Sequence, residues 1–255
     1  MERYSSDKSC VIVVPIYKTH INRYENISLS QCLKILSNYD IKFVAPRELD
    51  LSFYDENVRN NVIFYEPEFF DGISGYNKFM QSKVFYESFI SYKYILIYQL
   101  DGFVFRDDLS KFLELDYDYI GAPWIYGQEI FQYVFRGHTR LKRLFPWFNH
   151  VDKIYVGNGG VSLRKVSAFL HIIEECKEFY HWQLNEDALY AFLGIRYPYL
   201  FHVAPMDVAL RFSFESEVRE CWVRNGRQLP TFCHAWEKWD IEFWRPYFKE
   251  CGYDI

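Results

Sequence analysis

One stretch of the sequence, Tyr94 to Phe105, constrains the fold more than any other. Residues 94–100 are rich in Ile, Leu and Tyr, the composition of a β-strand that is buried on both faces of a sheet. The strand pattern ends at a carboxylate, Asp101, and a glycine, Gly102, before the chain becomes apolar again. Open α/β sheets bind their ligands at the carboxyl ends of such strands, so Asp101 is a candidate binding residue. The alternative is that Asp101 only begins a turn with Gly102.

The rest of the chain alternates between strand and helix patterns. Short runs rich in β-branched residues predict strands, and apolar residues at helical spacing predict helices. The predicted strands are 10–17, 41–45, 61–65 and 117–124. The predicted helices are 27–36, 77–91 and 166–179. Asn26 or Ser28 would cap the first helix, and a loop at 69–76 would precede the second. This alternation predicts an α/β fold with a mixed, mainly parallel sheet flanked by helices. The sequence has no linker or repeat, so we expect a single domain over residues 1–255, with a nucleotide-side half of about 1–108 and an acceptor-side half of 109–255.

Two motifs in the second half combine polar residues with glycine or with a helix start. The stretch Gly157-Asn-Gly-Gly160 lets the backbone approach a ligand closely or adopt positive φ, and it lacks the Gly-Lys-Ser/Thr ending of a P-loop. Glu186 and Asp187 follow Asn185 at a predicted helix start. In one interpretation Asn185 caps the helix and the two acids complement its dipole. In the other, one acid is a general base.

Composition excludes several classes of protein. The net charge of −5 gives no support to a nucleic-acid binder. The six cysteines are scattered without a CxxC pair, which predicts unpaired thiols in a reducing compartment instead of a zinc site. Met1 does not begin an apolar signal segment, and no run approaches the roughly 18 apolar residues of a membrane span. We therefore expect a cytoplasmic protein. The 24 Phe, 22 Tyr and 7 Trp favour a ligand with flat or apolar faces.

Residues 125–150 break the alternating pattern. This segment mixes basic side chains with aromatic ones: Arg136, His138, Arg140, Lys142 and Arg143 with Phe131, Tyr133, Phe135, Phe145, Trp147 and Phe148. It is either an aromatic-anchored surface excursion or a flap that meets a phosphate-bearing or membrane-bound acceptor, which would be a peripheral membrane contact.

Five motifs in order resemble one known family. Tyr76-Asn-Lys-Phe-Met, a helix pattern and the strand that ends at Asp101 are similar to the core signature of GT-A-fold glycosyltransferases, in which a Lys-bearing helix precedes a strand ending in Asp-x-Asp. The further matches are Asp118-Tyr-Ile-Gly-Ala-Pro-Trp124, Gly157-Asn-Gly-Gly-Val-Ser-Leu-Arg164, Asn185-Glu-Asp187 and Cys233-His-Ala-Trp236. In this order the motifs resemble a bacterial GT-A-like family associated with surface polysaccharide synthesis, such as O-antigen or capsule, and the resemblance spans roughly residues 10–248.

The resemblance implies a hexosyltransferase that uses a nucleoside diphosphate sugar, uridine-linked, and a saccharide or lipid-linked saccharide acceptor at the inner face of the plasma membrane. Asp101 would bind Mn²⁺ or Mg²⁺, with His234 as a further ligand, because a divalent cation neutralises the departing diphosphate. Asp187 would be the general base of an inverting transfer, and Glu186 would orient acceptor hydroxyls. The remaining implied contacts are Pro15, Tyr17, Lys78, Gln99, Asn158, Gly159 and Gly160 with the donor, and Trp124 and Trp236 with the acceptor.

The sequence departs from the family pattern at Gln99-Leu-Asp101, where the common motif has Asp-x-Asp. A neutral Gln99 hydrogen-bonds ribose but adds no charge, so metal-independent transfer stays open, as does a retaining mechanism. Two other classes are alternatives. A nucleotidyltransferase is disfavoured because the loop 15–20 after the first strand lacks glycine. A non-catalytic carbohydrate-binding protein on a transferase scaffold would fit the missing acid. The sugar, the acceptor and the linkage do not follow from the sequence.

Overall fold

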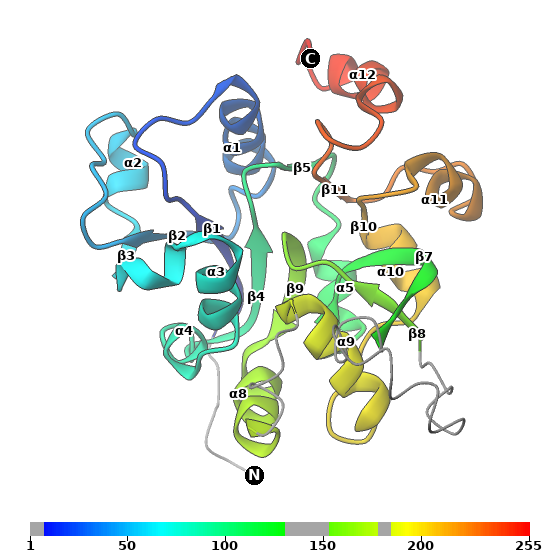
Figure 1. Ribbon diagram of the computed structural model, residues 1–255. Helices are drawn as coiled ribbons and strands as arrows, with labels where there is room; N and C mark the ends of the chain where they lie inside the picture. Colours follow the sequence, from blue (N-terminus) through cyan, green and yellow to red (C-terminus); the bar gives the residue numbers. More distant parts are fainter. Residues whose placement is uncertain (1–7, 131–152, 178–184) are drawn as a thin grey trace, which may run out of the picture.

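The computed structural model describes residues 8–130, 153–177 and 185–255. Its centre is a six-stranded sheet (Figure 1). The strand order is β3 (Val62–Tyr65), β2 (Asp40–Pro46), β1 (Lys8–Pro15), β4 (Tyr92–Tyr98), β9 (Val161–Lys165) and β6 (Tyr119–Ile120). The first four strands run parallel, and β9 pairs antiparallel with both β4 and β6. The predicted mixed, mainly parallel α/β sheet is confirmed.

Helices cover both faces of this sheet because its central strands are apolar on both sides. In β1, Ile12 and Val14 face one core, whereas Val11 and Val13 face the other. The first face packs against α1 (Arg23–Ile35), α5 (Leu109–Glu114) and α10 (Met206–Phe212). The second packs against α3 (Gly72–Met80), α4 (Lys83–Glu87), α8 (Val166–Glu175) and α9 (Glu186–Arg196). Both helix layers can be followed in Figure 1.

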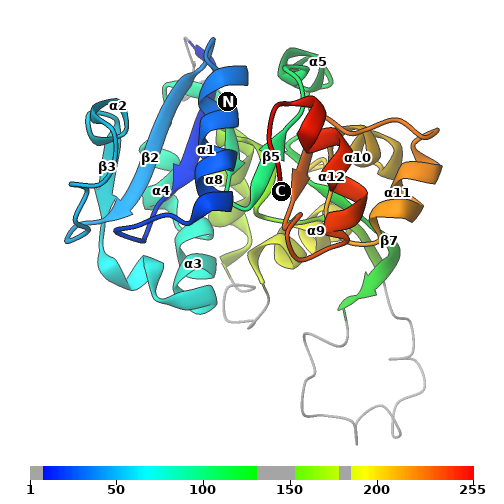
Figure 2. The same ribbon diagram turned by 90° about the horizontal axis from the view of Figure 1, so that it is seen from above.

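Two small sheets and the C-terminal helices complete the fold. A three-stranded sheet has the order β10 (Ser213–Phe214), β11 (Phe232–His234) and β5 (Gly102–Val104), and a two-stranded sheet joins β7 (Ala122–Glu129) and β8 (Lys153–Gly157). The remaining helices of the described residues are α2 (Glu56–Arg59), η1 (Pro67–Phe70), α11 (Val218–Arg224) and α12 (Ile241–Glu250). A third core, which includes Trp236, Trp244 and Phe248, joins the three-stranded sheet to α12. Figure 2 shows the blue and cyan N-terminal elements beside the orange and red C-terminal ones.

Helix boundaries differ from prediction at the start of α1 and in the segment that follows β3. Helix α1 begins at Arg23, and its cap is Asn22, which forms a reciprocal capping box with Glu25; the predicted caps Asn26 and Ser28 lie inside the helix. The single helix expected after residue 76 is instead two helices, α3 and α4, and residues 69–76 are largely helical. Ser82 divides the two helices because its hydroxyl accepts a hydrogen bond from the N–H of Phe85, which starts α4.

Other expectations concern the thiols and the membrane. All six cysteines are free, as their spacing predicted. In the three described ranges, no helix combines the length and the apolar character that spanning a bilayer requires.

Helix α8 ends at Glu175, before the predicted end at 179. Most of the basic and aromatic segment, residues 131–150, lies outside the described residues.

Candidate active site

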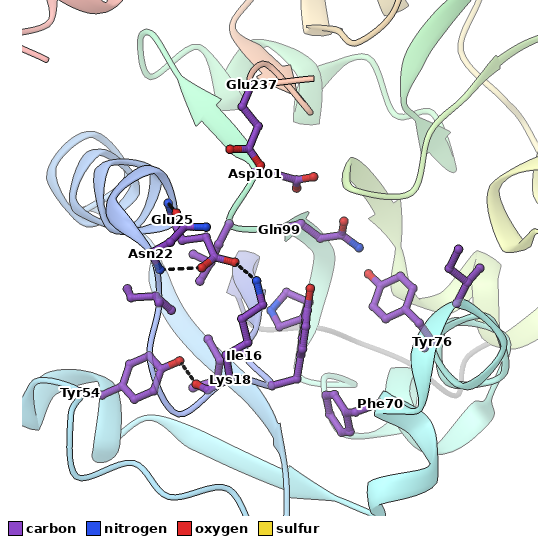
Figure 3. Close-up of a pocket in the computed structure, with 16 residues that line it drawn as sticks. Ile16, Lys18, Asn22, Glu25, Tyr54, Phe70, Tyr76, Gln99, Asp101 and Glu237 are labelled. Carbon is purple, nitrogen blue, oxygen red and sulfur yellow. Dashed lines mark hydrogen bonds and ion pairs between the residues drawn. The ribbon is translucent and has the colours of Figure 1, made fainter. Parts of the chain in front are cut away.

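A cavity of about 410 Å³ opens at the carboxyl ends of β1 and β4 (Figure 3). Its lining includes two predicted residues from the end of β1, Pro15 and Tyr17, and two that follow β4, Gln99 and Asp101. The other lining residues are Ile16, Lys18, Ile21, Asn22, Glu25, Tyr54, Phe70, Gly72, Ile73, Tyr76, Leu100 and Glu237. The predicted position of a ligand site at the end of this strand therefore coincides with a cavity.

The small sheet β10-β11-β5 places His234 beside Asp101. Strand β5 begins directly after Asp101, and its antiparallel pairing with β11 sets His234 opposite Gly102. As a result, Nε2 of His234 lies 3.0 Å from Oδ1 of Asp101. Burial lowers the pKa of His234, but Asp101 and Glu215 outweigh burial and raise it to about 10. Burial likewise opposes ionisation of Asp101, yet the adjacent imidazole holds its pKa below the usual value.

The glycine-rich loop between β8 and β9 lies against this pair. The N–H of Gln99 donates to the carbonyl of Gly160 over 2.8 Å, which brings the loop to the end of β4. A Cβ on Gly160 would lie 1.9 Å from Nε2 of His234, and one on Gly159 would lie 1.8 Å from Oε1 of Glu186. Both glycines are thus required by close approach of side chains. The positive φ expected of this stretch falls instead on Asn158, at 70°.

Asp187 is the second residue of α9, and Glu186, the first, packs against the glycine loop. Asn77 of α3 caps this helix from outside, because its Oδ1 accepts a hydrogen bond of 3.0 Å from the N–H of Glu186. The predicted cap, Asn185, makes no capping hydrogen bond with its side chain. Burial and the carboxylates of Glu186 and Glu215 raise the pKa of Asp187 to about 7. A carboxyl group with this pKa suits general-base chemistry near neutral pH.

Glu186 does not occupy the position expected of an acceptor-binding residue. Its side chain is buried, and its Oε1 lies 3.0 Å from Nη2 of the fully buried Arg164. The carboxylate is enclosed by protein and pairs with a cation, a position that does not favour contact with acceptor hydroxyls, and the role of orienting them stays a prediction. Glu186 instead joins the start of α9 to β9, and through Gly159 to the glycine loop.

The two tryptophans expected at the acceptor site are also buried. Trp236 has no exposed surface and packs against Phe248, with ring centroids 4.6 Å apart. Trp124 is 8% exposed and packs its ring over Gly157, where a Cβ would lie 1.9 Å from the indole. Their burial leaves little ring surface for stacking on a sugar, and their assignment as acceptor contacts stays a prediction. Lys78 is exposed on α3 and does not line the cavity, and its contact with the donor stays a prediction.

Sequence reasoning missed three charged residues at this site: Glu215, Glu237 and Arg164. Glu215 follows β10 as Asp101 follows β4, so an acid at the end of an apolar run was the available signal. Glu237 extends from the segment after β11 to the cavity, beside Asp101 (Figure 3). Arg164 is a cation inside the apolar strand β9, and a charge in such a position indicates a buried partner.

The described residues fit a divalent cation at the end of β4. Asp101 offers a carboxylate oxygen and His234 an imidazole nitrogen at 3.0 Å from each other, a donor pair that suits Mn²⁺. Within residues 8–130, 153–177 and 185–255, no three His, Cys, Asp or Glu side chains are grouped so as to hold a metal ion. The remaining coordination positions would belong to diphosphate oxygens and water.

Several solved structures share this fold. The galactosyltransferase LgtC, solved with donor and acceptor sugar analogs, has a TM-score of 0.57 at 15% identity, covering 95% of this chain and 95% of that chain. Mouse xyloside xylosyltransferase 1 has a TM-score of 0.53 at 14% identity, covering 89% of this chain and 97% of that chain. The mannosyltransferase Ktr4p of S. cerevisiae has a TM-score of 0.50 at 10% identity, covering 72% and 64%. The chain has the GT-A fold of glycosyltransferases.

The family follows from the sequence match. The model of the family described as protein of unknown function (DUF5672) matches residues 59–234, from before β3 to the end of β11, and this protein belongs to that family. The matched range includes Asp101, the glycine loop, Asp187 and His234. No curated protein matches the chain.

Proposed function

We propose that this protein is a glycosyltransferase that moves a hexose from a nucleoside diphosphate sugar, uridine-linked, to a saccharide or lipid-linked saccharide acceptor. The proposed transfer inverts the anomeric centre, with Asp187 as the general base. Surface polysaccharide synthesis at the inner face of the plasma membrane is the proposed setting, with residues 125–150 as the membrane or acceptor contact.

One observation carries this proposal. A cavity of about 410 Å³ at the end of β4 contains Asp101, which contacts His234, and Gln99 of the same turn is hydrogen-bonded to the glycine loop. A nucleotide-sized cavity at the carboxyl end of a central strand in a GT-A fold suits a nucleoside diphosphate. The glycine loop next to it would line the space of the donor sugar, and Gln99 would hydrogen-bond the ribose.

The charges around the cavity favour a donor that arrives with a cation. The lining carries three carboxylates, Glu25, Asp101 and Glu237, and one amine, Lys18, which forms an ion pair of 2.5 Å with Glu25. A diphosphate would therefore enter a cavity of its own sign unless a positive charge accompanied it. Mn²⁺ or Mg²⁺ at Asp101 and His234 would supply that charge and stabilise the departing diphosphate.

The proposed chemistry of the chain is proton removal at one carboxylate. As the acceptor oxygen bonds to C1 of the sugar, the bond from C1 to the diphosphate breaks, and the ionised carboxylate of Asp187 takes the hydroxyl proton. The pKa of about 7 leaves a large fraction of Asp187 ionised at neutral pH while keeping it basic enough to accept the proton. Glu186 and Arg164 would hold the start of α9, and with it Asp187, against the glycine loop.

Release of nucleoside diphosphate from a panel of nucleotide sugars tests this proposal. We expect wild-type protein with Mn²⁺ to release product from at least one uridine-linked hexose, and Asp187→Asn to lose about 10²–10⁴-fold of the rate while still binding the nucleotide. Asp207→Asn is the matched control, because Asp207 is an exposed acid that pairs only with Arg211 among the interactions described for it. Unchanged turnover in Asp187→Asn would reject the base assignment.

A further inference from the structure

The strand that precedes Glu215 brings it to the same edge of the small sheet as Asp101 and His234. Strand β10 pairs parallel with β11, with Phe214 opposite Cys233, so the next residues along the two strands, Glu215 and His234, are neighbours. Asp101 lies on the other side of His234, through the antiparallel pairing of β11 with β5. The topology therefore places His234 between two carboxylates.

Glu215 contacts two different parts of the candidate site. Its Oε1 lies 3.3 Å from Nδ1 of His234, the imidazole nitrogen that does not face Asp101. Its Oε2 accepts a hydrogen bond from the side-chain amide of Asn158. One carboxylate thus connects the histidine to the loop that carries Gly159 and Gly160.

The contact with Glu215 is one of two that hold the side chain of Asn158. The backbone of Asn158 is left-handed, with φ of 70°, a conformation that asparagine adopts more readily than most residues other than glycine. Its amide is held at both ends: Nδ2 donates to Glu215, and Oδ1 accepts from the N–H of Gly160 over 3.1 Å. Because Gly160 packs directly on the ring of His234, a shift of the loop and a rotation of the imidazole are mechanically linked.

We infer that Glu215 is a positioning residue: its carboxylate pairs with the Nδ1 side of His234, directs Nε2 toward Asp101 and the cation, and fixes the loop at Asn158 that would line the donor-sugar pocket. This inference rests on the proposed function. A histidine that binds a metal commonly donates its other N–H to a carboxylate, and loss of that partner typically lowers metal affinity by 10–100-fold. A purely structural role for Glu215 would affect folding but not metal or nucleotide affinity in the folded protein.

The test compares Glu215→Gln with wild type in the full chain, by titration with Mn²⁺ alone and with Mn²⁺ plus UDP, and by thermal unfolding without metal. Glutamine keeps the shape but has only one acceptor oxygen for the two donors, His234 and Asn158. We expect Mn²⁺ affinity to fall about tenfold or more, and UDP affinity to fall with it. The matched control is Glu220→Gln, an acid of α11 that pairs with Arg224 on the surface.

Each outcome decides the inference. Folded Glu215→Gln that binds Mn²⁺ and UDP as wild type does would overturn it while leaving the proposed function intact. Wild type that binds neither would overturn the proposed function and this inference together. If Glu215→Gln does not fold, Glu215→Asp replaces it, because the shorter carboxylate keeps the charge but cannot reach both donors; equal affinity to wild type would again contradict the inference. Losses in Glu215→Gln and Asn158→Ala that fail to add in the double variant would support it.

Discussion

The guanidinium of Arg164 lies 3.0 Å from the carboxylate of Glu186, and the two side chains are 0% and 4% exposed. Arg164 also donates to the hydroxyls of Ser162, at 2.9 Å, and Tyr86, at 3.0 Å. The pair joins β9 of the central sheet to the first turn of α9. It therefore fixes the residue that follows Glu186, the candidate base Asp187, relative to the strand that follows the glycine loop.

Breaking this ion pair should destabilise the protein strongly. We expect Arg164→Met to cost about 3–5 kcal/mol, because it leaves the charge of Glu186 buried without a partner. Thermal unfolding checks this, because in a chain of this size each kcal/mol of lost stability lowers the melting temperature by roughly 2–4 °C. The double variant Arg164→Met with Glu186→Leu should lose less than the single one, since no charge is stranded.

The exposed pair Arg245–Glu242 is the matched control for the buried pair. Its side chains are 44% and 69% exposed, so Arg245→Met should cost less than about 1 kcal/mol. Equal destabilisation by Arg164→Met and Arg245→Met would show that burial does not determine the strength of the Arg164 interaction.

The rate of sugar transfer should rise with pH through the pKa of Asp187. Burial and two neighbouring carboxylates raise that pKa to about 7, and only the ionised form accepts a proton. We expect kcat to increase about tenfold from pH 5.5 to 6.5 and to level off above pH 8, measured at saturating donor. Glu220→Gln should leave the profile unmoved, and a rate independent of pH over this range would exclude Asp187 as the base.

The same group should make stability depend on pH. A raised pKa means that folded Asp187 binds a proton more tightly than unfolded Asp187, so the unfolding free energy falls as pH rises from about 4 to 7. Asp187→Asn removes this pH-dependent loss of unfolding free energy, because asparagine does not ionise. We expect the variant to melt above wild type at pH 8 and no higher than wild type at pH 4. Melting curves at both pH values decide the point.

The sequence predicted the sheet and the position of the cavity because both depend on local pattern. The apolar run of β4 and its terminal acid required no information from elsewhere in the chain. The partners of Asp101 could be inferred only by resemblance, because His234 reaches Asp101 through the pairing of β11 with β5, two strands that lie far apart in the sequence. The burial of individual side chains was harder to predict than the strand pairing. Trp236 and Glu186 are residue types common in sugar-binding sites, and only tertiary packing shows that both are enclosed. Glu215 was missed because the strand before it, β10, is only two residues long, which makes the signal of an acid at a strand end weak.

Binding of Mn²⁺ should become tighter as pH rises. His234 lies between two carboxylates that raise its pKa to about 10, so at neutral pH a metal must displace a proton from its imidazole. We expect the affinity to increase roughly tenfold for each pH unit between 6.5 and 8.5, measured by titration calorimetry. His234→Gln should bind more weakly and with a flat pH dependence. A wild-type affinity that does not change with pH would remove His234 from the metal site.

The most direct test of the central claim is thermal unfolding of wild type and Asp101→Ala with UDP, with Mn²⁺, and with both. A ligand that binds only the folded state raises the melting temperature. We expect UDP with Mn²⁺ to raise it in wild type by several degrees more than either alone, and we expect this gain to disappear in Asp101→Ala or after chelation. An equal rise in Asp101→Ala, or none in wild type with any nucleoside diphosphate, would contradict a donor site at the end of β4.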